Sequence, residues 1–190
     1  LVTSVILLMD SCTRRMKTNN YKSSYNKREN TKNKTILNQK QGVNNCYSKK
    51  AKNKKGCHLI LDAHRQRTRK TLVSQGIQNN EIITVDINSH IQDDLHNKTS
   101  LKEYGLSTEK KFVSFFADTI STPKNALQEV KPYFERKILK DNCIFVITTC
   151  PRGITGQKFS RFEPELKKLA LKNGYKLNPI TIPNTLRLKV

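Results

Sequence analysis

The sequence predicts an α/β fold in which a mostly parallel sheet carries helices on both faces and finishes in an antiparallel β-hairpin. Apolar runs of strand length alternate with helix-length segments from His58 onward. Three of these runs close on an acid, at Asp62, Asp86 and Asp118. The last two extended runs are joined by only two residues, which is too short a connection for a parallel crossover.

The first strand-helix-strand unit runs from His58 to Asp86. Leu59-Ile60-Leu61 reads as a buried strand and Ile82 to Val85 as a second one. Between them, Arg65 to Gly76 has a narrow apolar face and a basic opposite face, with Gly76 as the stop of a helix.

The following segment is less regular. Residues 88–97 are compatible with a short helix, and residues 101–107 with a short strand or a loop. The pattern returns with a hydrophobic strand at 112–118, a helix that opens at Thr122-Pro123, and a continuous apolar strand at 143–149.

The end of the chain differs in kind. A helix over about 160–173 stops at Gly174, and two extended runs follow, 175–182 and 185–190. Because only Pro183-Asn184 joins them, we expect them to form the antiparallel hairpin.

The net charge of +21 is the dominant bulk property of this 190-residue chain. Such a field favours polyanions, of which nucleic acid is the partner we expect. A Lys/Asn-rich composition spread over solvated faces is the alternative explanation. Residues 1–56 hold 14 of the 36 Lys and Arg but only 2 of the 15 acids, so the excess is concentrated there.

The composition predicts two parts: a basic, Lys/Asn-rich disordered segment over residues 1–56 and an α/β domain over 57–190. Residues 13–56 contain too few large aliphatic side chains to offset the entropy of ordering the chain. Such a tail could hold phosphates, serve as an organelle transit segment, or be a linker without a partner.

Cysteine usage and hydropathy limit the cellular compartments in which we expect the protein. The five cysteines are odd in number and form no C-x-x-C pair, which favours an intracellular reducing compartment and no metal site. No run approaches the ~20 apolar residues of a membrane span. The run Val5 to Met9 precedes its basic residues, the wrong order for a secretory signal. The chain starts with Leu, which fits a fragment, or a translated leader ahead of Met9 or Met16.

The three aspartates are the first candidates for function, because ligands of open parallel sheets bind outside the carboxyl ends of the strands. An aspartate just past a strand is also a common helix cap or turn residue. Cations cluster at the same edge although several of them oppose the helix dipole, which favours contact with phosphate or with a ligand. The candidate cations are Arg65, Arg67, Arg69 and Lys70 in the first helix and Arg152 in the loop 151–156, with His64 as a candidate base or cation.

The order of elements from His58 to Val190 resembles the class I S-adenosylmethionine-dependent methyltransferase superfamily, which has a Rossmann-like fold. The resemblance implies S-adenosylmethionine as cofactor, bound by Asp62, His64 and Asp86, with Asp86 on the ribose hydroxyls. It implies a catalytic position for Asp118, beside the transferred methyl group. The chain departs from the family where glycines are expected after the first strand, since none occurs before Gly76.

Three functions follow as expectations. The first is an enzyme, a methyltransferase acting on nucleic acid through the basic residues named above. The second is a catalytically inactive protein of the same fold that binds nucleic acid or has a structural role. The third is a different nucleotide-binding or phosphate-handling α/β domain. A receiver-type phosphoacceptor is disfavoured because Asp62 lacks a second acid beside it.

Overall fold

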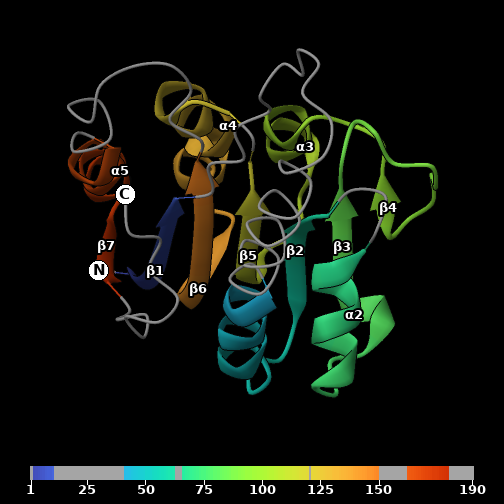
Figure 1. Cartoon of the computed structure of the whole chain (residues 1–190). Helices are drawn as coiled ribbons and strands as arrows, with labels where there is room; N and C mark the ends of the chain where they lie inside the picture. Colours follow the sequence, from blue (N-terminus) through green and yellow to red (C-terminus); the bar gives the residue numbers. More distant parts are fainter. Residues whose placement is uncertain (1, 11–40, 63–65, 120, 150–161, 180–190) are drawn as a thin grey trace, which may run out of the picture.

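A seven-stranded parallel sheet forms the centre of the molecule (Figure 1). The computed structural model describes residues 2–10, 41–62, 66–119, 121–149 and 162–179. The strands are β1 (Val2–Asp10), β2 (Cys57–Leu61), β3 (Ile82–Val85), β4 (His96–Asn97), β5 (Phe112–Asp118), β6 (Leu139–Thr149) and β7 (Tyr175–Pro179). Their order in the sheet is β4-β3-β2-β5-β6-β1-β7, and every pairing among the described strands is parallel.

Helices cover both faces of this sheet. The helices are a helical segment over 41–51, α2 (Arg67–Ser74), the short 3-10 helix η1 (Asn79–Glu81), α3 (Leu101–Ser107), α4 (Pro123–Glu135) and α5 (Phe162–Lys172). One hydrophobic cluster joins α3, α4 and α5 to one face, and a second joins the segment 41–51 and α2 to the other. The predicted α/β fold with helices on both faces is therefore confirmed.

The strand order from β4 to β6 is that of a Rossmann-like sheet. The chain runs outward from β2 through β3 to β4, then returns to place β5 beside β2 and continues to β6. The direction of winding thus reverses between β2 and β5, which is where open α/β sheets form their ligand crevice.

The final described strand, β7, lies at one edge of the sheet. β7 lies parallel to β1, with Val2 opposite Tyr175 and Val5 opposite Asn178. Its predicted hairpin partner, residues 185–190, lies outside the described residues.

The N-terminal third contributes to the sheet and its cover. β1 lies parallel to β6, with Val5 opposite Ile144, and the segment 41–51 is helical. The prediction of a disordered tail over 1–56 is therefore wrong for residues 2–10 and 41–56, while residues 11–40 lie outside the described residues. Val43, Tyr47 and Ala51 are all buried, and their spacing of four is the helical signal that composition alone obscured.

Two short elements also differ from the prediction. Residues 88–97 form turns and the two-residue strand β4 rather than a helix, and residues 101–107 form α3 rather than a strand or loop. Ser100 and Glu103 make a capping box at the start of α3, with Ser100 Oγ accepting the Glu103 N–H. This S-x-x-E spacing is the sequence signal for a helix start.

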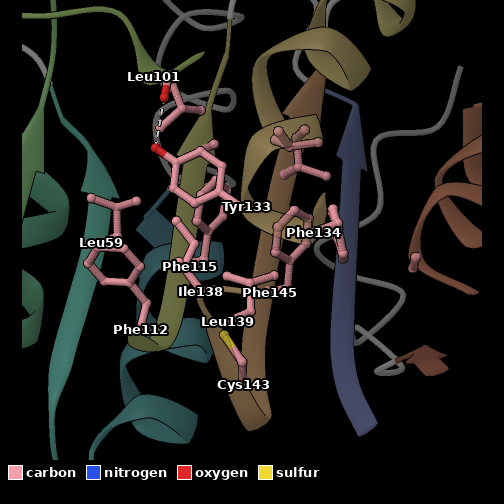
Figure 2. Packing of buried hydrophobic residues seen from close by; sticks show 14 of the residues in the cluster. Leu59, Leu101, Phe112, Phe115, Tyr133, Phe134, Ile138, Leu139, Cys143 and Phe145 are labelled. Carbon is pink, nitrogen blue, oxygen red and sulfur yellow. Dashed lines mark hydrogen bonds between the residues drawn. The ribbon is translucent and has the colours of Figure 1, made fainter. Parts of the chain in front are cut away.

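Figure 2 shows the cluster under α3 and α4. The rings of Phe115 and Phe145, from neighbouring strands, stack with centroids 4.6 Å apart, and the Tyr133 ring meets Phe115 edge-on at 4.9 Å. The Tyr133 hydroxyl donates to the Leu101 carbonyl at 2.7 Å, so a buried polar tip ties α4 to α3. A Cβ at Gly105 would lie 2.7 Å from the Tyr133 ring, which is why this helical position needs a glycine.

On the opposite face a buried polar triangle anchors the segment 41–51 to the sheet. Ser114 Oγ in β5 lies 2.6 Å from the Tyr47 hydroxyl and 2.7 Å from Nδ1 of His58 in β2. All three side chains are buried, and burial lowers the pKa of His58 and raises that of Tyr47. Hydrogen bonding therefore has to offset the cost of burying these groups.

Replacing Ser114 by alanine leaves both the Tyr47 hydroxyl and His58 Nδ1 without their partner. We expect Ser114→Ala to lower the free energy of unfolding by about 2–6 kcal/mol, because each of the two stranded buried groups costs about 1–3 kcal/mol. Urea denaturation measures the change. The exposed-site control Ser107→Ala should change stability by less than about 1 kcal/mol, and equal effects of the two variants would contradict the anchoring role.

Candidate functional site

The three sequence-predicted aspartates lie level with one another at the carboxyl edge of the sheet. In the strand register Leu61 of β2 is opposite both Val85 of β3 and Ala117 of β5. The residues that follow, Asp62, Asp86 and Asp118, therefore continue three adjacent strands, with Asp62 in the middle. Asp62 and Asp118 flank the point where the direction of winding reverses, as the sequence predicted for a ligand edge.

The Asp62 carboxylate binds the N-terminus of α2. Its Oδ2 accepts the Arg69 N–H at 2.9 Å, and the backbone N–H groups of Thr68 and Arg67 also stabilise its charge. Gln66, the residue before the helix, has a left-handed backbone (φ 46) and no side-chain capping bond. Asp62 thus supplies the negative charge that the helix start lacks.

Burial nevertheless raises the pKa of Asp62 from its usual value near 3.8 to about 6. The three backbone N–H groups oppose this shift, and the nearby charge of Asp118 adds to it. Burial is the largest cause, because removing a carboxylate from water disfavours its charged form. The carboxyl group is therefore poised to exchange a proton slightly below neutral pH.

Asp86 is buried, and it begins a tight turn that its own oxygen atoms hold together. Its Oδ1 accepts the Asn88 N–H at 2.7 Å, and its carbonyl accepts the Ser89 N–H at 3.0 Å. Among the described residues, Oδ2 makes no hydrogen bond. One carboxylate oxygen holds the turn, and the other has capacity for a ligand hydroxyl or amine.

Asp118 is half-buried and is held by a threonine from the next strand. Thr148 Oγ1 donates to Asp118 Oδ1 at 2.5 Å, and Thr119 Oγ1 donates to the Thr148 carbonyl at the same distance. Sequence reasoning did not assign a role to these threonines. The only signal was that the apolar run of β6 ends in two hydroxyl residues, Thr148 and Thr149.

Three buried polar atoms at this edge have no hydrogen-bond partner among the described residues. They are Thr149 Oγ1, at the end of β6, Asn97 Nδ2, at the end of β4, and Ser121 Oγ, between β5 and α4. Buried polar atoms are almost always paired in native proteins, so these three have hydrogen-bonding capacity left over. All three follow the carboxyl ends of strands, on the edge that carries the aspartates.

The predicted cations are dispersed. Arg69 is buried, and its guanidinium donates to Asn79 Oδ1 at 2.9 Å and to Thr84 Oγ1 at 2.6 Å, so it joins α2 to η1 and β3. Its predicted contact with nucleic acid is therefore wrong. Arg67 is half-buried and Lys70 is exposed. His64, Arg65 and Arg152 lie outside the described residues.

Other classes of site receive no support from the described part of the chain. It contains no group of three or more His, Cys, Asp and Glu residues arranged to hold a metal ion, and no helix long and apolar enough to cross a bilayer. Cys46, Cys57 and Cys143 are free thiols. No protein-family model, curated protein or solved structure matches the chain, so the site has to be interpreted from its own chemistry.

The raised pKa of Asp62 predicts a pH-dependent cost to stability. Because the folded form holds its proton up to about pH 6 while the unfolded form loses it near 3.8, the free energy of unfolding falls as pH rises between these values. Asp62→Asn keeps a hydrogen-bond acceptor without the charge. We expect it to match the parent near pH 3.5 and to exceed it by up to about 2–3 kcal/mol at pH 7.

Urea unfolding at four values between pH 3.5 and 7 measures this difference. The exposed loop variant Asp94→Asn serves as the charge-matched control, and its difference from the parent should stay small across the range. A constant difference between Asp62→Asn and the parent would contradict the raised pKa.

Proposed function

We propose that the carboxyl edge of the sheet binds S-adenosylmethionine and that the chain is a methyltransferase acting on nucleic acid. The observation that carries the proposal is the row of three carboxylates, Asp86, Asp62 and Asp118, across the point where the winding reverses. The edge combines the position expected of a nucleoside site with a negative charge.

The charge of the edge selects among nucleoside ligands. Dinucleotides and nucleoside triphosphates carry phosphates, which bind the free N–H groups of a helix N-terminus. Here the Asp62 carboxylate already binds the N-terminus of α2, and Asp118 adds a second negative charge nearby. S-adenosylmethionine has no phosphate, and its ammonium and sulfonium outweigh its one carboxylate, so its net positive charge complements this edge where a phosphate would be repelled.

The residues present fit such a ligand in distinct roles. Asp86 has one carboxylate oxygen available for the ribose hydroxyls, and Asp62 can pair with the ammonium. The unpaired Thr149 Oγ1 and Asn97 Nδ2 supply further polar contacts. When bound, the cofactor supplies an electrophilic methyl group, and Asp118, oriented by Thr148, is placed to accept a proton or hydrogen bond from the methyl acceptor.

The net charge of +21 supports a polyanionic acceptor, because a protein of this charge attracts nucleic acid over distances of about a Debye length. Arg67 and Lys70, at the start of α2, are the described cations of the originally predicted set that remain accessible for such contacts.

The second candidate, a binding protein of the same fold without catalysis, is favoured by a different observation. Asp62 is engaged by α2, Asp86 by its own turn and Asp118 by Thr148, so each carboxylate also has a structural partner. The two candidates differ in whether the chain binds the methyl donor at all.

Calorimetric titration with S-adenosylmethionine and with its demethylated product tests the proposal. We expect binding of both by the parent chain, and a loss of roughly 10-fold to 100-fold in Asp86→Asn, since a hydrogen bond to a charged group contributes about 1.5–3 kcal/mol. The isosteric amide preserves the turn made by Oδ1, so this variant should remain folded.

Asp94→Asn, an exposed acid in the same β3 to β4 connection, is the matched control and should bind as the parent does. If the parent chain gives no binding heat with S-adenosylmethionine and none with its demethylated product, the methyltransferase proposal is rejected. The binding protein without catalysis is then the remaining candidate. Equal affinity of Asp86→Asn and the parent rejects the assigned role of Asp86.

A further inference from the structure

The amino edge of the sheet, opposite the aspartates, contains a cavity of about 700 Å³ lined by lysines. Lys111 lines it from just before β5, Lys137 from the turn after α4 and Lys140 from the start of β6. Asp141 is the one acid among its lining residues. All three lysines are exposed, so their charges are available to a ligand.

The lysines gather here because of the parallel topology. Lys54 and Lys55 precede β2, Lys110 and Lys111 precede β5, and Lys137 precedes β6. Because every strand starts at the same edge of a parallel sheet, these separate lysines converge on one side of the molecule. The sequence shows them only as scattered positive charges.

The wall of the cavity is built by an irregularity in β6. Between the pairs Phe112 with Leu139 and Ser114 with Ile144, β6 has an excess of residues over β5, so its chain bulges outward. The bulge exposes Lys140, Asp141 and Asn142.

Two non-glycine residues beside the cavity, Lys137 (φ 53) and Asn142 (φ 56), adopt left-handed backbone conformations. Lys137 follows the end of α4, where its N–H bonds to the Phe134 carbonyl and the Ile138 N–H bonds to the Tyr133 carbonyl, so its left-handed backbone closes the helix. Asn142 is of a residue type that tolerates this conformation. The turn after α4 thereby places Lys137 at the cavity.

We infer that this cavity is a binding site for the phosphodiester backbone of nucleic acid. Lysine ammonium groups bind phosphate as point charges and do not read base edges in the manner of a bidentate arginine. The aromatic residue of the lining, Tyr175, is buried, and its hydroxyl donates to the Leu139 carbonyl, so it offers no face on which a base could stack. Recognition is therefore independent of sequence. A nucleic-acid strand can also enter a concave cavity more readily than a flat lipid surface can.

This site lies apart from the proposed cofactor edge. The strands between the two edges are five to seven residues long in β2 and β5, which corresponds to about 20 Å. A nucleic acid held at the amino edge is thus anchored away from the aspartates. The inference holds whether or not the carboxyl edge binds a methyl donor, and its test uses no cofactor.

Binding of the full chain to a fluorescein-labelled 20-nucleotide single strand, followed by anisotropy from 50 to 300 mM salt, tests the inference. We expect the triple variant Lys111→Gln, Lys137→Gln, Lys140→Gln to bind roughly 10-fold or more weakly at 50 mM salt. Its slope of log K against log salt should be shallower by about 2, as removal of three phosphate contacts requires. Oligo-dT and oligo-dC should behave alike.

The matched control removes three exposed lysines that follow the carboxyl ends of strands: Lys98→Gln, Lys102→Gln, Lys124→Gln. It has the same net charge as the first variant and should keep most of the affinity and slope of the parent. Residues 11–40 are present in both triple variants, so their charges contribute equally to the two affinities. Urea midpoints equal to that of the parent establish that both variants are folded.

Equal losses in the two triple variants would overturn the inference, because they would reflect net charge alone. Unchanged binding by the first variant would overturn it as well. The inference would also be overturned if the first triple variant kept its affinity for the oligonucleotide but lost binding to vesicles containing phosphatidylserine. The cavity would then bind an anionic lipid.

Discussion

The parallel direction of every described strand is the constraint on which the rest of the structure depends. Each crossover has to return the chain to the same edge before the next strand begins, so strand starts and strand ends are separated across the sheet. Residues that follow strands, such as Asp62 and Asp118, meet at one edge, and residues that precede strands, such as Lys111 and Lys137, meet at the other. Asp62, Asp86 and Asp118 therefore lie at one end of the strands, and the three lysines of the cavity lie at the other.

The polar groups inside the fold divide into those that stabilise it and those held at a cost. Ser114 Oγ bonds both the Tyr47 hydroxyl and His58 Nδ1, so this buried triangle fixes the segment 41–51, while His58 Nε2 has no partner among the described residues. Asp62 differs, because burial raises its pKa to about 6 even though three backbone N–H groups oppose the shift. Asp62 thus caps α2 although burial at the reversal point of the sheet disfavours its charged form.

Much of the fold and part of the site could be predicted from local pattern. The strands β2, β3 and β5 are apolar runs with clear ends, so the positions of Asp62, Asp86 and Asp118 followed directly. Arg69 could not be placed in this way. Its burial depends on Asn79 and Thr84, which reach it only through tertiary packing. The helical segment 41–51 carried a weak signal, the spacing of its buried residues, within a composition typical of disorder.

The sequence by itself determined the α/β class, the central strands and the acids at their carboxyl ends, because these depend on short-range periodicity and on where each apolar run stops. Only the tertiary structure decided that β1 lies between β6 and β7, that Arg69 is internal and that lysines from separate connections converge on one cavity. These outcomes depend on contacts between residues far apart in the chain. Local propensity carries no information about such contacts, and the packing of the whole sheet is what selects them.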